Sequence, residues 1–247
     1  MLPATSNIAD TYWARNVGCS VEELRPRMPH VRAQAGDLMG YEGIFILQFG
    51  AAPLVSVPPE LVPELFPSAA EFTLEAVSDR ERIRQLLAPC AVTRVIGPAL
   101  LCYADESCFR PPPLEGARAL TASDAAAFAM LKARCVPEEC EAKEFDLESG
   151  NTFGDLDASG ALRAVANFHI WSDRIAHIGV ITDAEARGRG HASRAVGVAT
   201  QEALRVGLVP QYRVLSDNLA SRRVAAKLGF EEHGWSVAAR LKSQPRS

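Results

Sequence analysis

A basic, glycine-rich segment between an apolar run and a helical pattern constrains this chain more than any other feature. Residues 187–192 read Arg-Gly-Arg-Gly-His-Ala; they follow the apolar run 175–182 and lead into residues 191–206, where small apolar residues recur at helical spacing. A helix that starts after such a turn has backbone N–H groups without intrahelical acceptors, and its dipole favours negative charge there. Glycines let a ligand approach the backbone closely. The segment therefore predicts an anion site whose natural occupant is a phosphorylated ligand.

Two common phosphate-binding patterns fit this segment poorly. A P-loop carries Lys and then Ser or Thr after its second glycine, whereas His-Ala follows Gly190. The dinucleotide fingerprint G-x-G-x-x-G/A meets Ser193 at its last position, and residues 183–187 separate it from the apolar run. Asp217 also lies farther on than the roughly 20 residues expected for a ribose-binding acid. Binding of NAD stays open as a weaker alternative.

Two motifs, in this order, resemble those of a known family. Arg187-x-x-Gly190-x-Ala192 is similar to the Arg/Gln-x-x-Gly-x-Gly/Ala signature of the GNAT N-acetyltransferases. Asn218-x-x-Ser221, followed by residues 227–230 (Lys-Leu-Gly-Phe), is similar to the family's Asn-x-x-Ala … Gly-Phe segment. The resemblance covers about residues 115–241. It implies acetyl-CoA as co-substrate, with its pyrophosphate held by the glycine-rich loop.

The resemblance also implies which residues hold the coenzyme. The strand before the loop would splay from its neighbour, so that its backbone could bond the pantetheine arm and polarise the acetyl carbonyl. Asn218 would contact the coenzyme, although helix N-capping is an equally good role for an Asn at that place. The predicted coenzyme residues are Val180, Ile181, Thr182, Arg187, Gly188, Arg189, Gly190, His191, Ala192, Ser193 and Asn218.

The catalytic groups are less well defined, because the chain departs from the family at two positions. The Tyr that often returns a proton to the thiolate is replaced by Ala225, which leaves Ser216 and Tyr212 as substitutes on the neighbouring strand. The carboxylate on the strand before the loop is replaced by Ala176. His177 is next to it, and because a histidine ordinarily titrates near neutral pH it is a candidate base, although strand alternation separates residues 176 and 177.

An acidic segment is the third source of candidate groups. Glu138, Glu139 and Glu141 follow the first helix of the C-terminal half, where the resemblance places the acceptor site. Glu139 is the representative candidate for a base or a cation-binding group, and a solvated acidic loop is the alternative. The net charge of −4 adds a slight preference for a cationic amine as acceptor.

Composition narrows the class of protein. With 48% apolar and 23% charged residues the chain is expected to fold into a packed core. Its acidic balance argues against nucleic-acid partners. The six cysteines form no CxxC pair and do not cluster with the histidines, so no metal site is expected. The chain start lacks a signal-peptide pattern and no apolar run reaches the ~20 residues of a membrane span, so a cytoplasmic protein with free thiols is predicted.

Pro111, Pro112 and Pro113 predict a domain boundary, because consecutive prolines favour an extended linker. Residues 1–113 are expected to form an accessory α/β domain or a degenerate GNAT-like duplicate, and residues 114–247 the acetyltransferase domain. In the first part we expect helices over 8–17, from Ser20, from Pro58 and over 80–87, with strands over 43–47, 54–57, 92–96 and 99–103.

In the second part we expect strands over 117–120, 152–155, 162–171, 175–182 and 211–215, closing hairpin strands over 230–241, and helices over 124–134, 191–206 and 220–228. The fold class is thus α/β (α+β), with a mixed, mostly antiparallel GNAT-like sheet flanked by helices. The function expected from the resemblance is direct transfer of an acetyl group from acetyl-CoA to a primary amine of a small molecule or protein, in a ternary complex. The alternative is a non-catalytic acyl-CoA sensor, in which residues 1–113 act as output or dimerisation module; a homodimer is compatible with both.

Overall fold

The chain builds two units from segments that are not consecutive. A computed structural model describes residues 1–135 and 144–242. Unit 1 comprises Met1–Thr5, Cys102–Arg213 and Leu219–Glu231, and unit 2 comprises Ser6–Leu101, Val214–Asn218 and the segment from Glu232. The division into domains at residues 113 and 114 stays a prediction. No helix among the described residues combines the length and the apolar character needed to cross a membrane.

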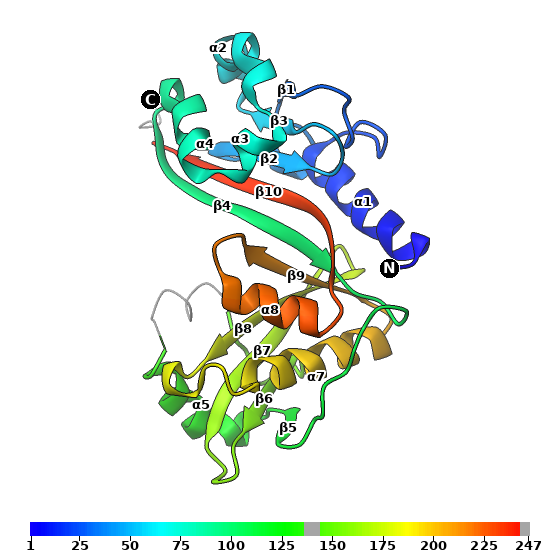
Figure 1. Cartoon of the computed structure of the whole chain (residues 1–247), viewed down its shortest axis with the longest axis vertical. Helices are drawn as coiled ribbons and strands as arrows, with labels where there is room; N and C mark the ends of the chain where they lie inside the picture. The colour runs from blue at the N-terminus through cyan, green and yellow to red at the C-terminus, as the bar shows by residue number, and fades with distance from the viewer. Residues whose placement is uncertain (136–143, 243–247) are drawn as a thin grey trace. The chain divides into compact units, whose positions relative to one another are not determined.

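Among the described residues, five strands form the sheet of unit 1 (Figure 1), in the order β9-β8-β7-β6-β5. They are β5 (Ala117–Ala119), β6 (Thr152–Leu156), β7 (Leu162–Trp171), β8 (Ile175–Thr182) and β9 (Val209–Leu215). The strands from β5 to β8 pair antiparallel, and β8 pairs parallel with β9. The predicted mixed, mostly antiparallel sheet is confirmed.

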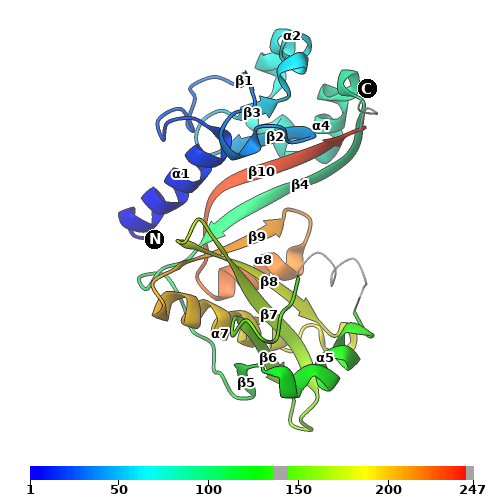
Figure 2. The same ribbon diagram turned by 180° about the vertical axis from the view of Figure 1, so that it is seen from behind.

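Helices cover both faces of this sheet. They are η5 (Ala122–Asp124), α5 (Ala125–Lys132), η6 (Ala184–Ala186), α7 (His191–Arg205) and α8 (Leu219–Lys227). Figures 1 and 2 show α5 and α7 on opposite faces. Phe128 and Leu131 of α5 pack with Val165 and Ile181 of the sheet. Helix α7 buries a stripe of small residues, as its sequence predicts: Ala195, Val196, Ala199 and Ala203.

Local sequence explains where these two helices start and stop. Thr121 and Asp124 form a reciprocal capping box at the start of η5, which runs directly into α5. Gly207 ends α7 with a φ of +77°, and its N–H and that of Leu208 bond to the carbonyls of Leu204 and Ala203. Helix α7 begins after Gly190, which provides no side-chain cap.

The strands of unit 2 follow one another in the order β1-β3-β2-β10-β4. The strands are β1 (His30–Ala33), β2 (Gly43–Gln48), β3 (Leu54–Val57), β4 (Val92–Tyr103) and β10 (Glu231–Leu241), and the α-helices are α1 (Pro3–Val17), α2 (Val62–Leu65), α3 (Leu74–Ser78) and α4 (Arg80–Leu86). Short 3₁₀ turns lie at Gly36–Leu38, Pro59–Leu61, Phe66–Glu71 and Ala88–Cys90. The core buries Val55, Leu65, Phe72 and Ile83 completely.

Two predicted pairs of strands are each a single strand. Residues 92–103 run through Gly97-Pro98 as β4, and residues 231–241 run through Gly234 as β10. A Cβ on Gly97 would lie 2.9 Å from the carbonyl oxygen of Ser236, and one on Gly234 would lie 2.7 Å from that of Gln48. These glycines therefore mark a close approach of neighbouring backbone, which the sequence alone cannot distinguish from a turn.

Three smaller expectations for the N-terminal residues also need correction. Ser20 and Glu23 make the predicted capping-box bonds, but a turn follows them instead of a helix. Pro26 and Pro29, soon after, explain why no helix propagates there. Helix α1 starts at Pro3, five residues before the predicted start, and β1 is a strand that the sequence analysis missed. The other predicted elements lie within a few residues of their expected bounds.

Candidate functional site

Strand β8 changes its pairing halfway along its length. Its register with β9 runs from Ile175 opposite Val209 to Ile178 opposite Tyr212. Its register with β7 continues through to Thr182. In the part of the chain that the structure describes, residues 179–182 thus pair on one side of the strand. Their other edge carries backbone donors and acceptors that a ligand can use in place of a strand.

The loop after β8 leads directly to the N-terminus of a 15-residue helix, α7. Gly188 and Gly190 both adopt left-handed conformations, with φ of +79° and +87°. Gly190 is the N-cap, and because it has no side chain it leaves the first N–H groups of the helix to other acceptors. Arg187 and Arg189 are exposed on this loop. The arrangement is the predicted one: a strand, a glycine turn, exposed positive charge and a helix start.

A buried carboxylate fixes the entrance to the loop. Asp183 follows β8, its side chain is fully buried, and its Oδ2 lies 2.8 Å from Nη1 of Arg163 and 3.1 Å from Nε of Arg134. Its other oxygen accepts a hydrogen bond from the backbone N–H of Glu185. Burial raises the pKa of Asp183, but the bonds from Arg163 and Glu185 outweigh burial and hold that pKa below its ordinary value. The carboxylate therefore stays ionised and anchors the chain where it leaves the strand.

A second buried carboxylate fixes the exit from the loop. Asp155 of β6 is fully buried and accepts two bonds from Arg194, Nε to Oδ1 at 2.8 Å and Nη2 to Oδ2 at 2.9 Å. Nδ1 of His191 lies 2.5 Å from the same Oδ2. Hydrogen bonding to Asp155 raises the pKa of Arg194, so this guanidinium stays charged. His191 was predicted as a coenzyme residue; its side chain is buried and bonded to Asp155, which leaves its backbone N–H for that role.

His177 lies on the sheet face that α5 partly covers. Its register partner on β7 is His169, and residues that are paired across a sheet share a face. The ring of His177 stacks on Trp171, with 4.0 Å between centroids and 13° between planes. Nδ1 of His177 lies 2.9 Å from Oε1 of Gln211, whose Nε2 lies 2.6 Å from the hydroxyl of Tyr103. No local sequence pattern predicts these hydrogen bonds, because Tyr103 and Gln211 lie 108 positions apart in the sequence.

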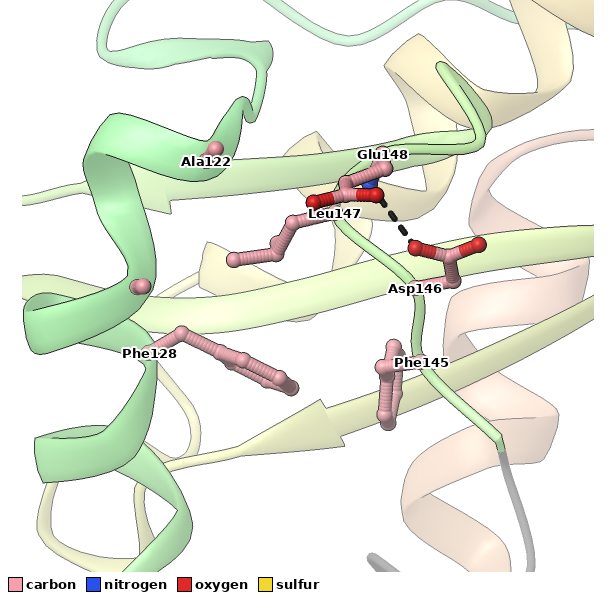
Figure 3. A pocket seen from close by; sticks show the side chains of 7 residues that line it. Ala122, Phe128, Phe145, Asp146, Leu147 and Glu148 are labelled. Atoms are coloured by element: carbon pink, nitrogen blue, oxygen red, sulfur yellow. Dashed lines mark hydrogen bonds between the residues drawn. The ribbon is translucent and has the colours of Figure 1, made fainter.

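Two cavities lie beside the segment 144–151. The first, of about 400 Å³, has apolar walls from Phe128 and Phe145, whose rings meet edge to face at 5.5 Å. Figure 3 shows these rings on opposite sides of the hollow, with Asp146 and Glu148 beside it. Both carboxylates are exposed, and the backbone N–H of Glu148 donates to Asp146. The cavity combines an apolar wall with negative charge.

The second cavity, of about 320 Å³, adjoins the face that carries His177. Its lining is mostly polar, and it includes the register partner of His177: Glu144, Asp146, Ser149, Asn151, Asn167, Phe168, His169 and Ile170. Asn167 is buried, and its Nδ2 lies 3.0 Å from Nε2 of His169. The cavity therefore presents two carboxylates and one imidazole to whatever enters it.

The other predicted site residues lie on or near β9 and α8, or fall outside the described residues. Ser216, predicted on a strand, lies in the turn after β9, and its N–H donates to Pro98. Asn218 directly precedes α8, as predicted. Tyr212 pairs with Ile178, on the sheet face opposite Gln211, and burial raises its pKa to about 12. Glu139, with Glu138 and Glu141, falls outside the described residues. Among the residues that are described, no three His, Cys, Asp or Glu side chains gather as a metal site would require.

Comparison with known proteins agrees with the resemblance. Residues 120–230 match the model of the acetyltransferase (GNAT) family. A GNAT-family acetyltransferase structure from Colwellia psychrerythraea shares the fold, with a TM-score of 0.51 and 16% identity over 74% of this chain and 70% of that one. A GNAT-family acetyltransferase structure from Novosphingobium aromaticivorans is 25% identical over 62% of this chain and 67% of that one, with a TM-score of 0.48.

A GCN5-related N-acetyltransferase from Kribbella flavida is 18% identical over 73% of this chain and 77% of that one, with a TM-score of 0.48. A comparison with proteins of curated function returned no match. The family match covers both motifs of the sequence, the glycine loop and the Asn218 segment, and the strands between them. The C-terminal half of the chain therefore carries a GNAT acetyltransferase domain, over residues 120–230.

Proposed function

We propose that this protein is an N-acetyltransferase that transfers the acetyl group of acetyl-CoA to a primary amine. The observation that carries the proposal is the coincidence of two features on one strand. The pairing of β8 with β9 ends at Ile178, and the helix start capped by Gly190 follows the same strand. An extended, amide-bearing arm with a diphosphate at its end suits a bare strand edge followed by an anion site.

The described residues suit this co-substrate chemically. The backbone N–H groups of His191, Ala192 and Ser193 lie in the first turn of α7, where a diphosphate is favoured by the helix dipole. Arg187 and Arg189 add exposed positive charge. A Cβ built on Gly188 would meet nothing within 4 Å, so there is open space over the loop. Val180, Ile181 and Thr182 would bond the pantetheine arm through their backbone, and Asn218 would contact the coenzyme at the start of α8.

The proposed chemistry is direct transfer in a ternary complex. The acceptor ammonium loses one proton, and the lone pair of the neutral amine attacks the thioester carbonyl carbon. The C–S bond then breaks, the thiolate leaves, and a second proton passes from nitrogen to sulfur. Backbone N–H groups of residues 180–182 would stabilise the oxyanion, the role that usually contributes most in acyl transfer. The products are the N-acetylated acceptor, CoA thiol and one proton in solvent.

A cationic amine is the proposed class of acceptor. The two cavities beside segment 144–151 carry the carboxylates of Glu144, Asp146 and Glu148. Carboxylates near an apolar wall favour an ammonium group carried on a partly apolar body. Glu139, in the neighbouring acidic segment, belongs to this proposal as a candidate base or cation-binding group, and Ser216 stays a candidate proton donor. We also propose that residues 1–113 have an accessory role and that the protein can form a homodimer.

An acyl-CoA sensor without chemistry is the second candidate. Ala225 is buried on α8 and Ala176 is fully buried on β8, so neither position offers an acid or a base. A sensor would bind acetyl-CoA through the same loop but would release no thiol with any amine. Thiol release from acetyl-CoA in the presence of a panel of di- and polyamines separates the two candidates.

The first test is calorimetric titration with acetyl-CoA of the wild-type protein and the Gly188→Trp variant. Gly160→Trp is a matched control, because Gly160 has a φ of +80°, close to the +79° of Gly188, and a Cβ at either position would meet nothing within 4 Å. Both substitutions carry the same backbone strain of about 1–3 kcal/mol. We expect binding by the wild type and by Gly160→Trp, and at least tenfold weaker binding by Gly188→Trp. Equal binding by all three proteins, or by none, would contradict the proposed site.

A further inference from the structure

The first cavity, beside α5, combines an aromatic pair with carboxylates that have no counter-ion from the described part of the chain. Phe128 and Phe145 meet edge to face at 5.5 Å, and Figure 3 shows Asp146 and Glu148 beside the hollow between them. Oδ1 of Asp146 accepts the backbone N–H of Glu148 at 2.8 Å. Neither carboxylate forms an ion pair with any residue that the structure describes. The cavity therefore offers uncompensated negative charge close to aromatic rings.

We propose that the acceptor is a linear aliphatic diamine or polyamine. Its distal ammonium is held in the first cavity by Glu148 and Asp146 against the ring of Phe145, and its reacting amine occupies the second cavity. This inference rests on the proposed acetyltransferase function and narrows the acceptor to a molecule with two amino groups on an alkyl chain. The acetyl transfer is unchanged: the C–N bond forms, the C–S bond breaks, and a proton passes to sulfur. The distal amine keeps its charge in the monoacetylated product.

An organic ammonium suits the first cavity better than a metal ion does. Hard cations such as Mg²⁺ and Ca²⁺ take about six or more oxygen ligands. Within residues 1–135 and 144–242, no three metal-ligating side chains gather in one place. The walls of this cavity are instead apolar, with Ala122, Ala125 and Leu147 beside the two rings. An ammonium on an alkyl chain uses both parts of such a site, the carboxylates for its charge and the apolar wall for its methylene groups.

One ring of the aromatic pair already contacts an ammonium group. Nζ of Lys132 lies 4.8 Å from the centroid of the Phe128 ring, within the range of a cation–π interaction. Phe128 is buried, whereas Phe145 is half-buried and lines the cavity with its accessible part. Phe145 is therefore the ring that an incoming ammonium can reach. The single positive charge of Lys132 faces the two carboxylates of Asp146 and Glu148, so these three side chains together remain negative.

Asp146 lines both cavities, so one extended molecule can reach from one to the other. The hydroxyls of Ser149 and Thr152 donate to the backbone carbonyl of Asp146 at 2.9 and 2.6 Å, which holds this segment in place. Glu144 lines the second cavity and Glu148 the first. Four residues of extended chain span at most about 14 Å. The two acidic sites therefore lie within the reach of an alkyl diamine or polyamine.

The second cavity leads toward the proposed thioester site. Its wall includes Asn167 of β7, whose register partner on β8 is Gly179. Paired residues on neighbouring strands lie about 5 Å apart. Gly179 is the first of residues 179–182, which extend beyond the pairing with β9 and whose backbone is proposed to polarise the thioester. A reacting amine in the second cavity is therefore one strand away from this backbone, and the distal ammonium points toward α5.

Two probes of equal length test the need for a second amine. Pentan-1-amine carries a methyl group where butane-1,4-diamine carries its distal ammonium. We expect kcat/KM, measured as thiol release from acetyl-CoA, to be at least tenfold higher for the diamine, which corresponds to about 1.4 kcal/mol. The preference should shrink at 1 M NaCl, because salt screens exposed charges. An equal kcat/KM for the two amines, or a higher value for pentan-1-amine, overturns the proposal.

Four variants locate the distal site. Glu148→Gln removes one charge and should lower the preference for the diamine roughly threefold, in the range of an exposed ion pair. Glu106→Gln is the control: Glu106 is an exposed carboxylate of unit 1 that lines neither cavity, and the preference should not change. Phe145→Leu keeps an apolar wall but removes the ring and should also lower the preference, whereas Phe145→Tyr should restore most of it. A preference that survives both Glu148→Gln and Phe145→Leu contradicts the proposed site.

A binding measurement separates this inference from the proposed function. Each of the two amines is titrated by calorimetry into the protein without coenzyme. We expect the diamine to bind at least tenfold more tightly than pentan-1-amine, and Glu148→Gln but not Glu106→Gln to weaken its binding. If the diamine binds in this way but the protein neither binds acetyl-CoA nor releases thiol, the proposed function fails and the acceptor role of the diamine fails with it, while the diamine site stands. If thiol is released equally with both amines, only the present inference fails.

Discussion

Asp155 and Arg194 form a two-point ion pair, with Nε at 2.8 Å from Oδ1 and Nη2 at 2.9 Å from Oδ2. Asp155 lies on β6 and Arg194 in the first turn of α7, so the pair ties the sheet to the helix start that follows the glycine loop. His191 bonds to the same carboxylate, and the Cβ position of Gly190 lies 3.1 Å from Nη1 of Arg194. The loop conformation therefore depends on a carboxylate 35 residues away from Gly190.

The Asp155→Asn substitution should weaken both the fold and the loop. It leaves the Arg194 guanidinium without its counter-charge, although the amide oxygen can still accept one bond. Removing one partner of a buried ion pair costs about 3–5 kcal/mol, and since Arg194 can turn toward solvent we expect about 2 kcal/mol of lost stability. We also expect acetyl-CoA to bind several-fold more weakly, because the first turn of α7 loses its anchor. Urea unfolding and calorimetry measure the two effects.

Glu202→Gln is the control for this prediction. Glu202 and Arg205 lie on the same helix and form an ion pair at 2.6 Å, but the Arg205 side chain is exposed and that of Glu202 is 30% exposed. Exposed pairs on a helix contribute about 0.3–0.5 kcal/mol. We therefore expect little change in either measurement. An Asp155→Asn variant with the stability of Glu202→Gln and wild-type affinity for acetyl-CoA would show that the Asp155 pair does not hold the loop.

Local patterns in the sequence were enough to predict much of unit 1. The glycine loop, β8 and α7 were predicted because turn chemistry and periodicity are properties of neighbouring residues. Structural features that depend on contacts between distant residues were not predicted. Gly97 and Gly234 suggested turns, and they lie instead inside strands, where neighbouring backbone comes too close for a Cβ. That approach is set by strand pairing, which no short stretch of sequence specifies.

The candidate site likewise contains residues that local sequence patterns indicated and residues that only distant contacts bring there. The loop residues from Arg187 to Ser193 were proposed from the glycine turn and the family resemblance, whereas the buried carboxylates Asp155 and Asp183 were not singled out. An Asp between Gly154 and Leu156 in an apolar strand is a signal for a buried partner, but it does not say which residue the partner is. The setting of His177 depends on β8 lying between β7 and β9. That order brings Trp171 and Gln211 to one imidazole.

Leu131→Ala should destabilise unit 1 strongly. Leu131 is fully buried on α5, in the cluster that includes Phe128 and Ile181. Truncation to Ala leaves a cavity and should cost about 2–5 kcal/mol in urea or thermal unfolding. The neighbouring Met130 is 63% exposed, so Met130→Ala should change stability by about 0.5 kcal/mol or less. Similar losses for the two variants would mean that α5 does not pack on the sheet through the Leu131 side.

Asp124→Asn should destabilise the protein in a pH-dependent way. The bonds from Arg118 hold the pKa of Asp124 at about 2, below its usual value of 3.8. A depressed pKa means that the ionised form stabilises the fold above pH ~4 and that this stabilisation is lost as the pH falls through 2. Because Arg118 is half exposed, we discount the effect for solvent screening to about 1 kcal/mol at pH 7.

Urea unfolding of the wild type and of Asp124→Asn at pH 7 and near pH 2.5 measures this dependence. The difference between the two proteins should shrink toward zero at the lower pH. Glu60→Gln, at an exposed position of unit 2, serves as a control and should track the wild type at pH 7. A difference between wild type and Asp124→Asn that stays constant over this interval would mean that the capping bonds of Asp124, which an amide can partly retain, outweigh its charge.

Arg187→Gln and Arg189→Gln should each weaken acetyl-CoA binding in a salt-dependent way. Both side chains are exposed on the loop, so each charge should contribute about 0.5–1 kcal/mol to holding a polyphosphate, or roughly two- to fivefold in Kd. Arg205→Gln is the matched control, because Arg205 ends the same helix about 21 Å from His191, well beyond the Debye length of about 8 Å at physiological salt. Calorimetry at 0.15 M and 1 M NaCl should show the loop variants converging on the wild type at high salt, because screening removes a contribution that depends on charge alone. A loss of affinity that persists at 1 M NaCl would instead indicate that the arginine side chains shape the loop, as the buried carboxylates do.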